Sequence, residues 1–305
     1  MAGEDIAFSA QNAVLRGWFY PPSDRSRTSP CIVLQTGFSG VKEMATPDYA
    51  EVLQAAGFAC LVYDHPGFGA SDALPQSPPQ EIDPWQQVRC IQDAISYAQS
   101  RPEVDPDRIG LWGTSFAGGH AIVVAAGDRR VKAVVTQLPL ISGSRTFDDL
   151  VPIGARADLE ATFAAERRAR FAGADPTLLP VVAADPTANA ALSSPGAYEY
   201  FTELARSSAP AWRNEVTLSS MELLRAYEPG AWIRLVAPTP LLIVAAPGDH
   251  LADGRQVLAA YEEALHPKKL VSLPGGHFDQ YSGTNFDRGS AATRDWFVEH
   301  LFPTT

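Results

Sequence analysis

The feature that most constrains the fold is a short apolar run that passes through one serine into a stretch of small residues. The run is Arg108-Ile-Gly-Leu-Trp-Gly113-Thr-Ser115-Phe-Ala-Gly-Gly-His120. The run of branched and bulky residues ends at Gly113, and the small residues Ala117, Gly118 and Gly119 follow, so the chain must turn sharply from a strand into a helix. Such a turn lifts the hydroxyl of Ser115 above a sheet, and the helix directs backbone N–H groups and its positive dipole end toward a reacting carbonyl.

Ala117 stands where the pattern G-x-S-x-G has its second glycine. Because that position needs only a small side chain, alanine satisfies the steric requirement. A serine that merely caps a buried helix is the competing interpretation. The strand–turn–helix context favours a nucleophilic serine instead.

Apolar strands alternate with helical patterns on both sides of this turn. The other expected strands cover 4–10, 13–21, 31–35, 58–63, 131–137, 240–246 and 269–273, and expected helices cover 46–56, 253–265 and 289–301. The first two strands are expected to pair antiparallel. The alternation predicts an α/β fold with a doubly wound, mostly parallel eight-stranded sheet.

Residues 140–235 interrupt this alternation with helical pieces and Ala- and Pro-rich stretches. We expect a helical cap here, and a core made of residues 1–139 and 236–305. Five aromatic residues of the cap are candidates for the substrate pocket, with packing inside the cap as the alternative for each of them. They are Tyr198, Tyr200, Phe201, Trp212 and Tyr227.

A serine hydroxyl needs a base, and the base needs a carboxylate to orient it. Asp249 follows the strand 240–246 by a Pro-Gly turn, and His277 follows the strand 269–273 by two glycines. Both therefore lie at the carboxyl ends of strands, which is the edge where open α/β sheets bind ligands. We predict Ser115 as nucleophile, His277 as base and Asp249 as acid, with Asp253 as the main rival acid.

The other histidines are weaker candidates for the base. His65 lies in a rigid turn, His266 is expected at a helix end, and the remaining three are adjacent to Asp249 or inside helices: His250, His120 and His300. The histidines are scattered and no C-x-x-C spacing occurs, so we predict no metal site and no cofactor.

A glycine-rich break, Thr36-Gly37-Phe38-Ser39-Gly40, follows the strand 31–35. Acyl hydrolases place an oxyanion donor after a strand of this kind. We expect the backbone N–H groups of Phe38 and Phe116 to stabilise an oxyanion, although a plain strand-to-helix turn would also explain the glycines.

Composition bounds the partners and the compartment. A net charge of −11 argues against nucleic acid and against an anionic membrane surface. The chain begins without a basic and apolar leader, and its three cysteines lie in apolar patterns without paired spacing. We therefore expect a cytoplasmic protein with reduced thiols that acts on a small-molecule acyl substrate; a homodimer is left open.

Four motifs together resemble a known family. They are Gly37-Phe-Ser-Gly-Val-Lys-Glu43, Tyr63-Asp-His-Pro-Gly-Phe-Gly-Ala-Ser-Asp72, Gly110-Leu-Trp-Gly-Thr-Ser-Phe-Ala-Gly-Gly119 and Trp212-Arg-Asn-Glu-Val-Thr217. The chain resembles the α/β-hydrolase superfamily, in its dienelactone-hydrolase and X-Pro-peptidase-like branch, and is similar to bacterial hydrolases related to fungal polyketide transferases and thiohydrolases. One departure concerns the oxyanion turn, because many relatives begin it with His-Gly and this chain has Thr36-Gly37.

The resemblance implies a triad of Ser115, Asp249 and His277 and acyl transfer to water or to another nucleophile. We expect a serine hydrolase that cleaves an ester, thioester or lactone with a largely apolar acyl part. An acyltransferase or a C–C bond hydrolase with the same triad is the nearest alternative. A binding protein that kept the fold and lost catalysis is the alternative of another class. A dehalogenase is disfavoured because its nucleophile is a carboxylate.

Overall fold

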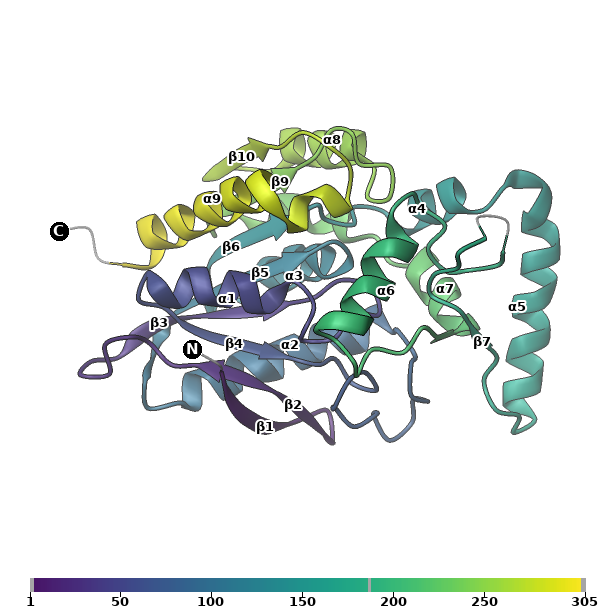
Figure 1. Cartoon of the computed structure of the whole chain (residues 1–305), viewed down its shortest axis with the longest axis horizontal. Helices are drawn as coiled ribbons and strands as arrows, with labels where there is room; N and C mark the ends of the chain where they lie inside the picture. The colour runs from purple at the N-terminus through teal and green to yellow at the C-terminus, as the bar shows by residue number, and fades with distance from the viewer. Residues whose placement is uncertain (1–2, 186–187, 303–305) are drawn as a thin grey trace.

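One eight-stranded sheet runs through the protein, in the strand order β1-β2-β4-β3-β5-β6-β9-β10 (Figure 1). The computed structural model describes residues 3–185 and 188–302. The strands are β1 (Glu4–Ala10), β2 (Ala13–Tyr20), β3 (Ser29–Gln35), β4 (Ala59–Tyr63), β5 (Val104–Thr114), β6 (Val131–Gln137), β9 (Leu241–Ala245) and β10 (Lys268–Ser272).

The antiparallel part of the sheet is confined to one edge. Gln11 and Asn12, both with positive φ, form the tight turn that joins β1 to β2. β2 pairs antiparallel with β4, and all the following neighbours are parallel. The predicted mostly parallel, eight-stranded α/β fold is therefore confirmed.

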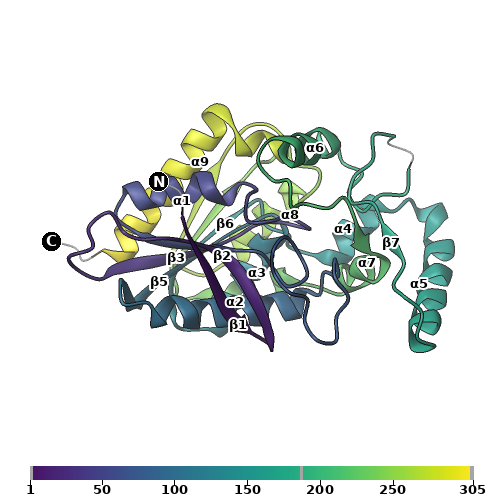
Figure 2. The ribbon, with the colours of Figure 1, turned by 60° about the horizontal axis from the view of Figure 1, so that its bottom comes forward.

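Helices cover both faces of the sheet, as Figure 2 shows from a second direction. One face carries α1 (Thr46–Ala55) and α9 (Gly283–Leu301). The opposite face carries α2 (Pro84–Ser100), α3 (Phe116–Gly127) and α8 (Gly254–Glu263). Because each helix buries apolar residues against a sheet that is itself buried on both sides, two apolar cores result, one on each face.

The parallel register brings the carboxyl ends of the central strands to one edge. Gln35 at the end of β3 pairs with Gly113 of β5, and Thr114 pairs with Gln137 at the end of β6. Gln137 in turn pairs with Val244 near the end of β9. Loops that follow these strands therefore start side by side.

A long insertion, residues 138–240, lies between β6 and β9 and extends beyond this edge, at the right of Figure 1. It contains α4 (Gly143–Leu150), η1 (Ile153–Ala155), α5 (Arg156–Phe171), α6 (Ala197–Ser207), α7 (Leu218–Arg225), η2 (Pro229–Val236) and a small antiparallel pair, β7 (Leu178–Leu179) with β8 (Val216–Thr217). The backbone N–H of Thr217 donates to the carbonyl of Gln80, which ties the insertion to the core. No helix in the described residues has both the length and the apolar character that crossing a bilayer requires.

Candidate active site

Ser115 lies at a strained turn between β5 and α3. Its backbone has φ 57° and ψ −124°, a conformation that non-glycine residues rarely adopt. A side chain at Gly113 would place its Cβ 2.2 Å from the carbonyl oxygen of Ala117, so the turn requires glycine there. The backbone of Ser115 is held by a 2.8 Å bond from its N–H to the carbonyl of Gln137. Between Ile109 and Ala126, Ser115 is the only residue that is not buried. The local structure thus exposes this hydroxyl and little else.

Asp249 and His277 meet beyond the ends of β9 and β10. His277 Nδ1 lies 2.6 Å from Asp249 Oδ2, and both side chains are buried. The other oxygen of Asp249 accepts hydrogen bonds from the backbone N–H groups of Leu251, at 2.8 Å, and Ala252, at 3.0 Å. Because its two oxygens are occupied, the carboxylate fixes one tautomer and one orientation of the imidazole. Ser115 and His277 line the same hollow.

The rival acid has a different partner. Asp253 caps the start of α8 by accepting from the backbone N–H of Arg255 at 2.9 Å, and it also forms an ion pair with the Arg255 side chain. These bonds lower the pKa of Asp253, the Arg255 side chain most. Asp253 therefore serves the helix end, and Asp249 is the carboxylate that contacts His277.

The other histidines lie elsewhere. His120 bonds to Tyr227 OH at 3.0 Å and to Gln87 at 2.9 Å inside the core. Burial lowers the pKa of His120 well below 6.5 and that of His65 to about 3, so both stay neutral. The last three are at the surface or in α9: His250, His266 and His300.

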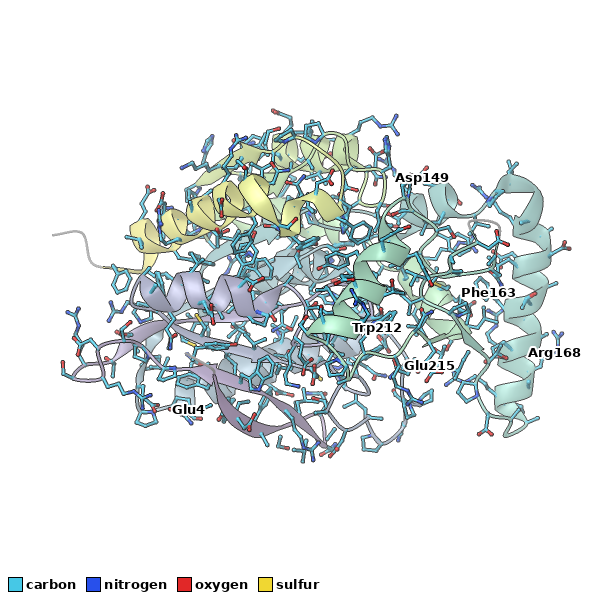
Figure 3. All side chains as sticks on the ribbon, viewed as in Figure 1. Glu4, Asp149, Phe163, Arg168, Trp212 and Glu215 are labelled. Atoms are coloured by element: carbon cyan, nitrogen blue, oxygen red, sulfur yellow. The ribbon has the colours of Figure 1, made fainter. Side chains whose placement is uncertain are left out.

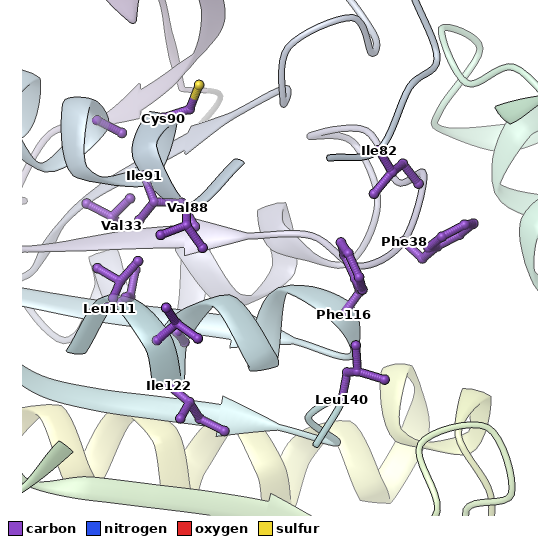
Figure 4. Packing of buried hydrophobic residues seen from close by; sticks show 14 of the residues in the cluster. Val33, Phe38, Ile82, Val88, Cys90, Ile91, Leu111, Phe116, Ile122 and Leu140 are labelled. Carbon is purple, nitrogen blue, oxygen red and sulfur yellow. The ribbon is translucent and has the colours of Figure 1, made fainter. Parts of the chain in front are cut away.

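Phe38, in the loop after β3, and Phe116, the first residue of α3, flank Ser115. Their rings pack edge to face with centroids 5.7 Å apart, and Figure 4 shows them together with Leu140 near the ends of the strands. Within the described residues, neither backbone N–H group has a hydrogen-bond partner. Both amides are therefore free to donate to a bound oxygen near Ser115, as an oxyanion hole requires.

The loop that carries Phe38 is supported by charge and by the insertion. Lys42 donates to the buried carboxylate of Asp64 through its backbone N–H, at 2.7 Å, and through its ammonium group, at 2.9 Å. Trp212 of the insertion donates to Ser39 Oγ at 3.4 Å. These contacts hold the turn in a chain that lacks the His-Gly start common among its relatives.

The inner hollow, as we name the space above Ser115, holds about 690 Å³ of empty space including its mouth. Apolar side chains from the insertion form much of its wall. Two of the five predicted cap aromatics, Tyr200 and Phe201, are among the lining residues. A largely apolar group bound next to Ser115 fits this wall.

The other three cap aromatics do not line the inner hollow. Tyr198 is 37% exposed on the outside of α6. Trp212 stacks on Phe201 from behind, with ring centroids 5.2 Å apart. Tyr227 is fully buried and bonds to His120. Trp212 and Tyr227 therefore have a packing role, the alternative considered for the cap aromatics, because each fills space between the insertion and the core.

The sequence did not single out several lining residues. Phe278 follows His277 directly and Tyr281 comes three residues later, where its OH lies 2.7 Å from Thr114 Oγ1 next to Ser115. Two aromatic residues within four positions of a predicted base were a usable signal. Three leucines of the insertion, Leu150, Leu192 and Leu224, carried no comparable signal.

Strand order and the serine turn at the carboxyl edge together define a class of protein: this is an enzyme with the α/β-hydrolase fold. The chain belongs to the α/β-hydrolase fold family, whose sequence model matches residues 30–284. The resemblance derived from the motifs is therefore confirmed.

Individual proteins show the same similarity over nearly the whole chain. The chain is 31% identical to the polyketide transferase grgF of Penicillium sp., over 92% of this chain and 90% of that protein. It is 33% identical to the thiohydrolase aneE of Aspergillus aculeatus, over 79% of this chain and 76% of that protein. A solved structure of DcsB in complex with its substrate analogue superposes with a TM-score of 0.86 at 29% identity, covering 98% of this chain and 99% of that one.

Proposed function

We propose that the protein cleaves an ester, thioester or lactone with a largely apolar acyl part through an acyl-enzyme on Ser115. One observation carries this proposal. A partly buried serine at a strained turn lines the same hollow as His277, whose Nδ1 lies 2.6 Å from the buried carboxylate of Asp249. A nucleophile, a base and an orienting acid are the parts that acyl transfer needs.

The reaction has two balanced halves. His277 Nε2 accepts the proton of Ser115 as Oγ attacks the acyl carbon, and the carbonyl oxygen becomes an oxyanion bound by the N–H groups of Phe38 and Phe116. Collapse breaks the bond to the alcohol or thiol, which leaves with the proton from His277. Water then attacks the acyl-enzyme by the same route, releasing the acid and restoring Ser115.

The insertion acts as a cap in this account. Tyr200 and Phe201 together with the leucines of the insertion cover the inner hollow on the side away from the sheet. Apolar walls favour an apolar acyl group, and covering the site limits the access of water. The polar atoms near Ser115 are left to orient the carbonyl.

The names of two relatives support acyl chemistry of this kind. They agree with transfer of the acyl group either to water or to another nucleophile. One is a thiohydrolase and the other a polyketide transferase. An acyltransferase or a C–C bond hydrolase with the same three residues is therefore the alternative function. A ligand-binding protein without catalysis is disfavoured by the contact between His277 and Asp249.

A panel of p-nitrophenyl esters and acyl thioesters of graded length tests the proposal. We expect release of product by the unsubstituted protein and a loss of several orders of magnitude in kcat for Ser115→Ala, with unchanged thermal unfolding. Faster product formation with an added amine or alcohol than with water alone would favour the transferase. Retention of most activity by Ser115→Ala would contradict the assignment.

A further inference from the structure

A second hollow, lined mostly by apolar residues, lies within the insertion, and we name it the outer hollow. It holds about 1540 Å³ of empty space including its mouth, and it lies among α4, α5, α7 and β7. Its apolar wall includes Phe147, Leu150, Leu159, Leu179, Leu218 and Met221. Among its described lining residues, Asp158 is the only charged one, and it is exposed.

The helix α5 covers this space while packing little against it. Only Phe163 and Glu166 of α5 are buried, and Figure 3 shows Phe163 on the side toward the rest of the insertion and Arg168 on the opposite side. Two ion pairs, Arg167 with Glu222 and Arg225 with Glu160, connect α5 to α7. The roof of the outer hollow is thus held by Phe163, whose ring centroid lies 6.2 Å from that of Phe147, and by these ion pairs.

The two hollows are separated by a layer one side chain thick. Leu150 lines both of them. On α4, Thr146 lines the inner hollow and the next residue, Phe147, lines the outer one. Leu192 lines the inner hollow and its neighbour Ala191 the outer one.

The same change of side occurs on α7. Leu224 lines the inner hollow, and Met221, one helical turn earlier, lines the outer one. Three separate elements therefore form a common partition, made mostly of apolar side chains. Leu150, which is half-buried, is the residue of this partition that contacts both spaces.

We propose that the outer hollow binds the distal part of a long, unbranched acyl chain, and that Leu150 and Leu192 are specificity-determining residues at the passage. The proposal rests on the proposed function in one respect, since it places the acyl carbonyl at Ser115. A chain that leaves the carbonyl past Leu150 enters the outer hollow and buries its methylene groups against apolar walls. Each buried methylene contributes favourable free energy, so chain length becomes the property that the site selects.

Binding of saturated fatty acids to the Ser115→Ala variant tests this without turnover. Across a series from butanoate to hexadecanoate, we expect the affinity to rise about fourfold for each added methylene, measured by calorimetric titration. When Thr162→Trp is added to Ser115→Ala, the new side chain fills the outer hollow from α5. The affinity should then stop rising at a shorter chain length than in Ser115→Ala alone. Ala161→Trp is the matched control, because Ala161 is the adjacent exposed residue on α5 and does not line either hollow.

A second pair of variants keeps the test decisive. Leu150→Trp should stop the rise at a still shorter acid than Thr162→Trp does, since it closes the passage itself. Ala155→Trp fills the outer hollow from a different element and should reproduce Thr162→Trp. If the affinity keeps rising up to hexadecanoate in both Thr162→Trp and Ala155→Trp, the proposal is overturned. If the affinity stops rising at the same chain length in Leu150→Trp and Thr162→Trp, Leu150 does not lie at the passage.

Turnover separates this inference from the proposed function. Hydrolysis of p-nitrophenyl butyrate by the chain with Ser115 intact tests the function alone, and we expect Ala161→Trp, which lines neither hollow, to leave it unchanged. If butyrate is not hydrolysed while the fatty-acid series behaves as expected, the function is wrong and the outer hollow still binds acyl chains. If p-nitrophenyl butyrate is hydrolysed but the affinity for fatty acids does not increase beyond short chains, the proposed function is supported and the outer hollow is not an acyl subsite.

Discussion

The helices α3 and α5 belong to the two regions of the molecule, and they are held in opposite ways. Every residue of α3 from Phe116 to Ala126 is buried, whereas α5 buries only Phe163 and Glu166. The proposed nucleophile therefore lies next to an element fixed on all sides, whereas the proposed outer subsite is lined by an element held by few contacts. Substitutions in the core should decide whether reaction occurs, and substitutions in the insertion should decide on what.

The largest effect is expected from a substitution in the core that removes a catalytic contact and leaves the packing intact. Asp249→Asn preserves shape but favours the wrong tautomer of His277, so we expect kcat to fall by roughly 10⁴. Asp253→Asn is the matched control, since it changes the same residue type four positions away at a helix cap. Steady-state kinetics on one ester gives kcat for both variants. A large loss of kcat in Asp253→Asn together with a small loss in Asp249→Asn would show that Asp253 is the acid of the triad.

Stability should divide in the same way. Leu111→Ala opens a cavity at a fully buried position of β5, and we expect the free energy of unfolding to fall by about 2–5 kcal/mol. Phe163→Ala removes the main apolar anchor of α5, so we expect faster amide exchange in α5 while amides of the sheet keep their protection. Hydrogen exchange with mass spectrometry measures both. If the amides of α5 exchange only when the whole protein unfolds, in either variant, the insertion is not a separate unfolding unit.

Substrate preference should respond to the insertion more than catalysis does. Tyr200→Ala and Phe201→Ala remove lining side chains, and we expect the ratio of kcat/KM between long and short esters to change about 10- to 200-fold. Tyr198→Ala is the control because its side chain lies outside the inner hollow. Equal losses on short and long esters, or a simple loss of thermal stability, would make these aromatics structural.

Acid should weaken the core, which contains buried histidines, while residues 138–240 contain none. Burial lowers the pKa of His65 from 6.5 to about 3. The unfolded chain therefore binds a proton below pH 6.5 that the folded chain refuses until about pH 3, so stability is complete above pH 6.5 and falls as the pH drops toward 3.

The expected slope from His65 is at most about 1.4 kcal/mol per pH unit, and His120 acts in the same direction. Urea unfolding at several pH values measures it, and His65→Phe should make the slope shallower by up to one proton. An unchanged slope in this variant would mean that His65 is protonated in the folded protein.

The comparison also explains what could be predicted from the sequence. The sheet and the contact between Asp249 and His277 were predictable because strand ends of a parallel sheet meet at one edge, so chain order fixes spatial order. Positions in the insertion were not, because its short helices follow no such rule. Tyr198, Tyr200 and Phe201 are near neighbours in one helix, yet helical rotation places Tyr198 outside and the other two against the hollow.

The proposed reaction requires Ser115 to be an activated nucleophile, and covalent labelling tests that directly. A fluorophosphonate probe should add one group per chain, on the peptide that contains Ser115, and mass spectrometry of the digested protein locates it. We expect labelling to disappear in Ser115→Ala and to slow greatly in His277→Gln, which loses the base. A folded protein that stays unlabelled, or one labelled at another residue, would contradict the account.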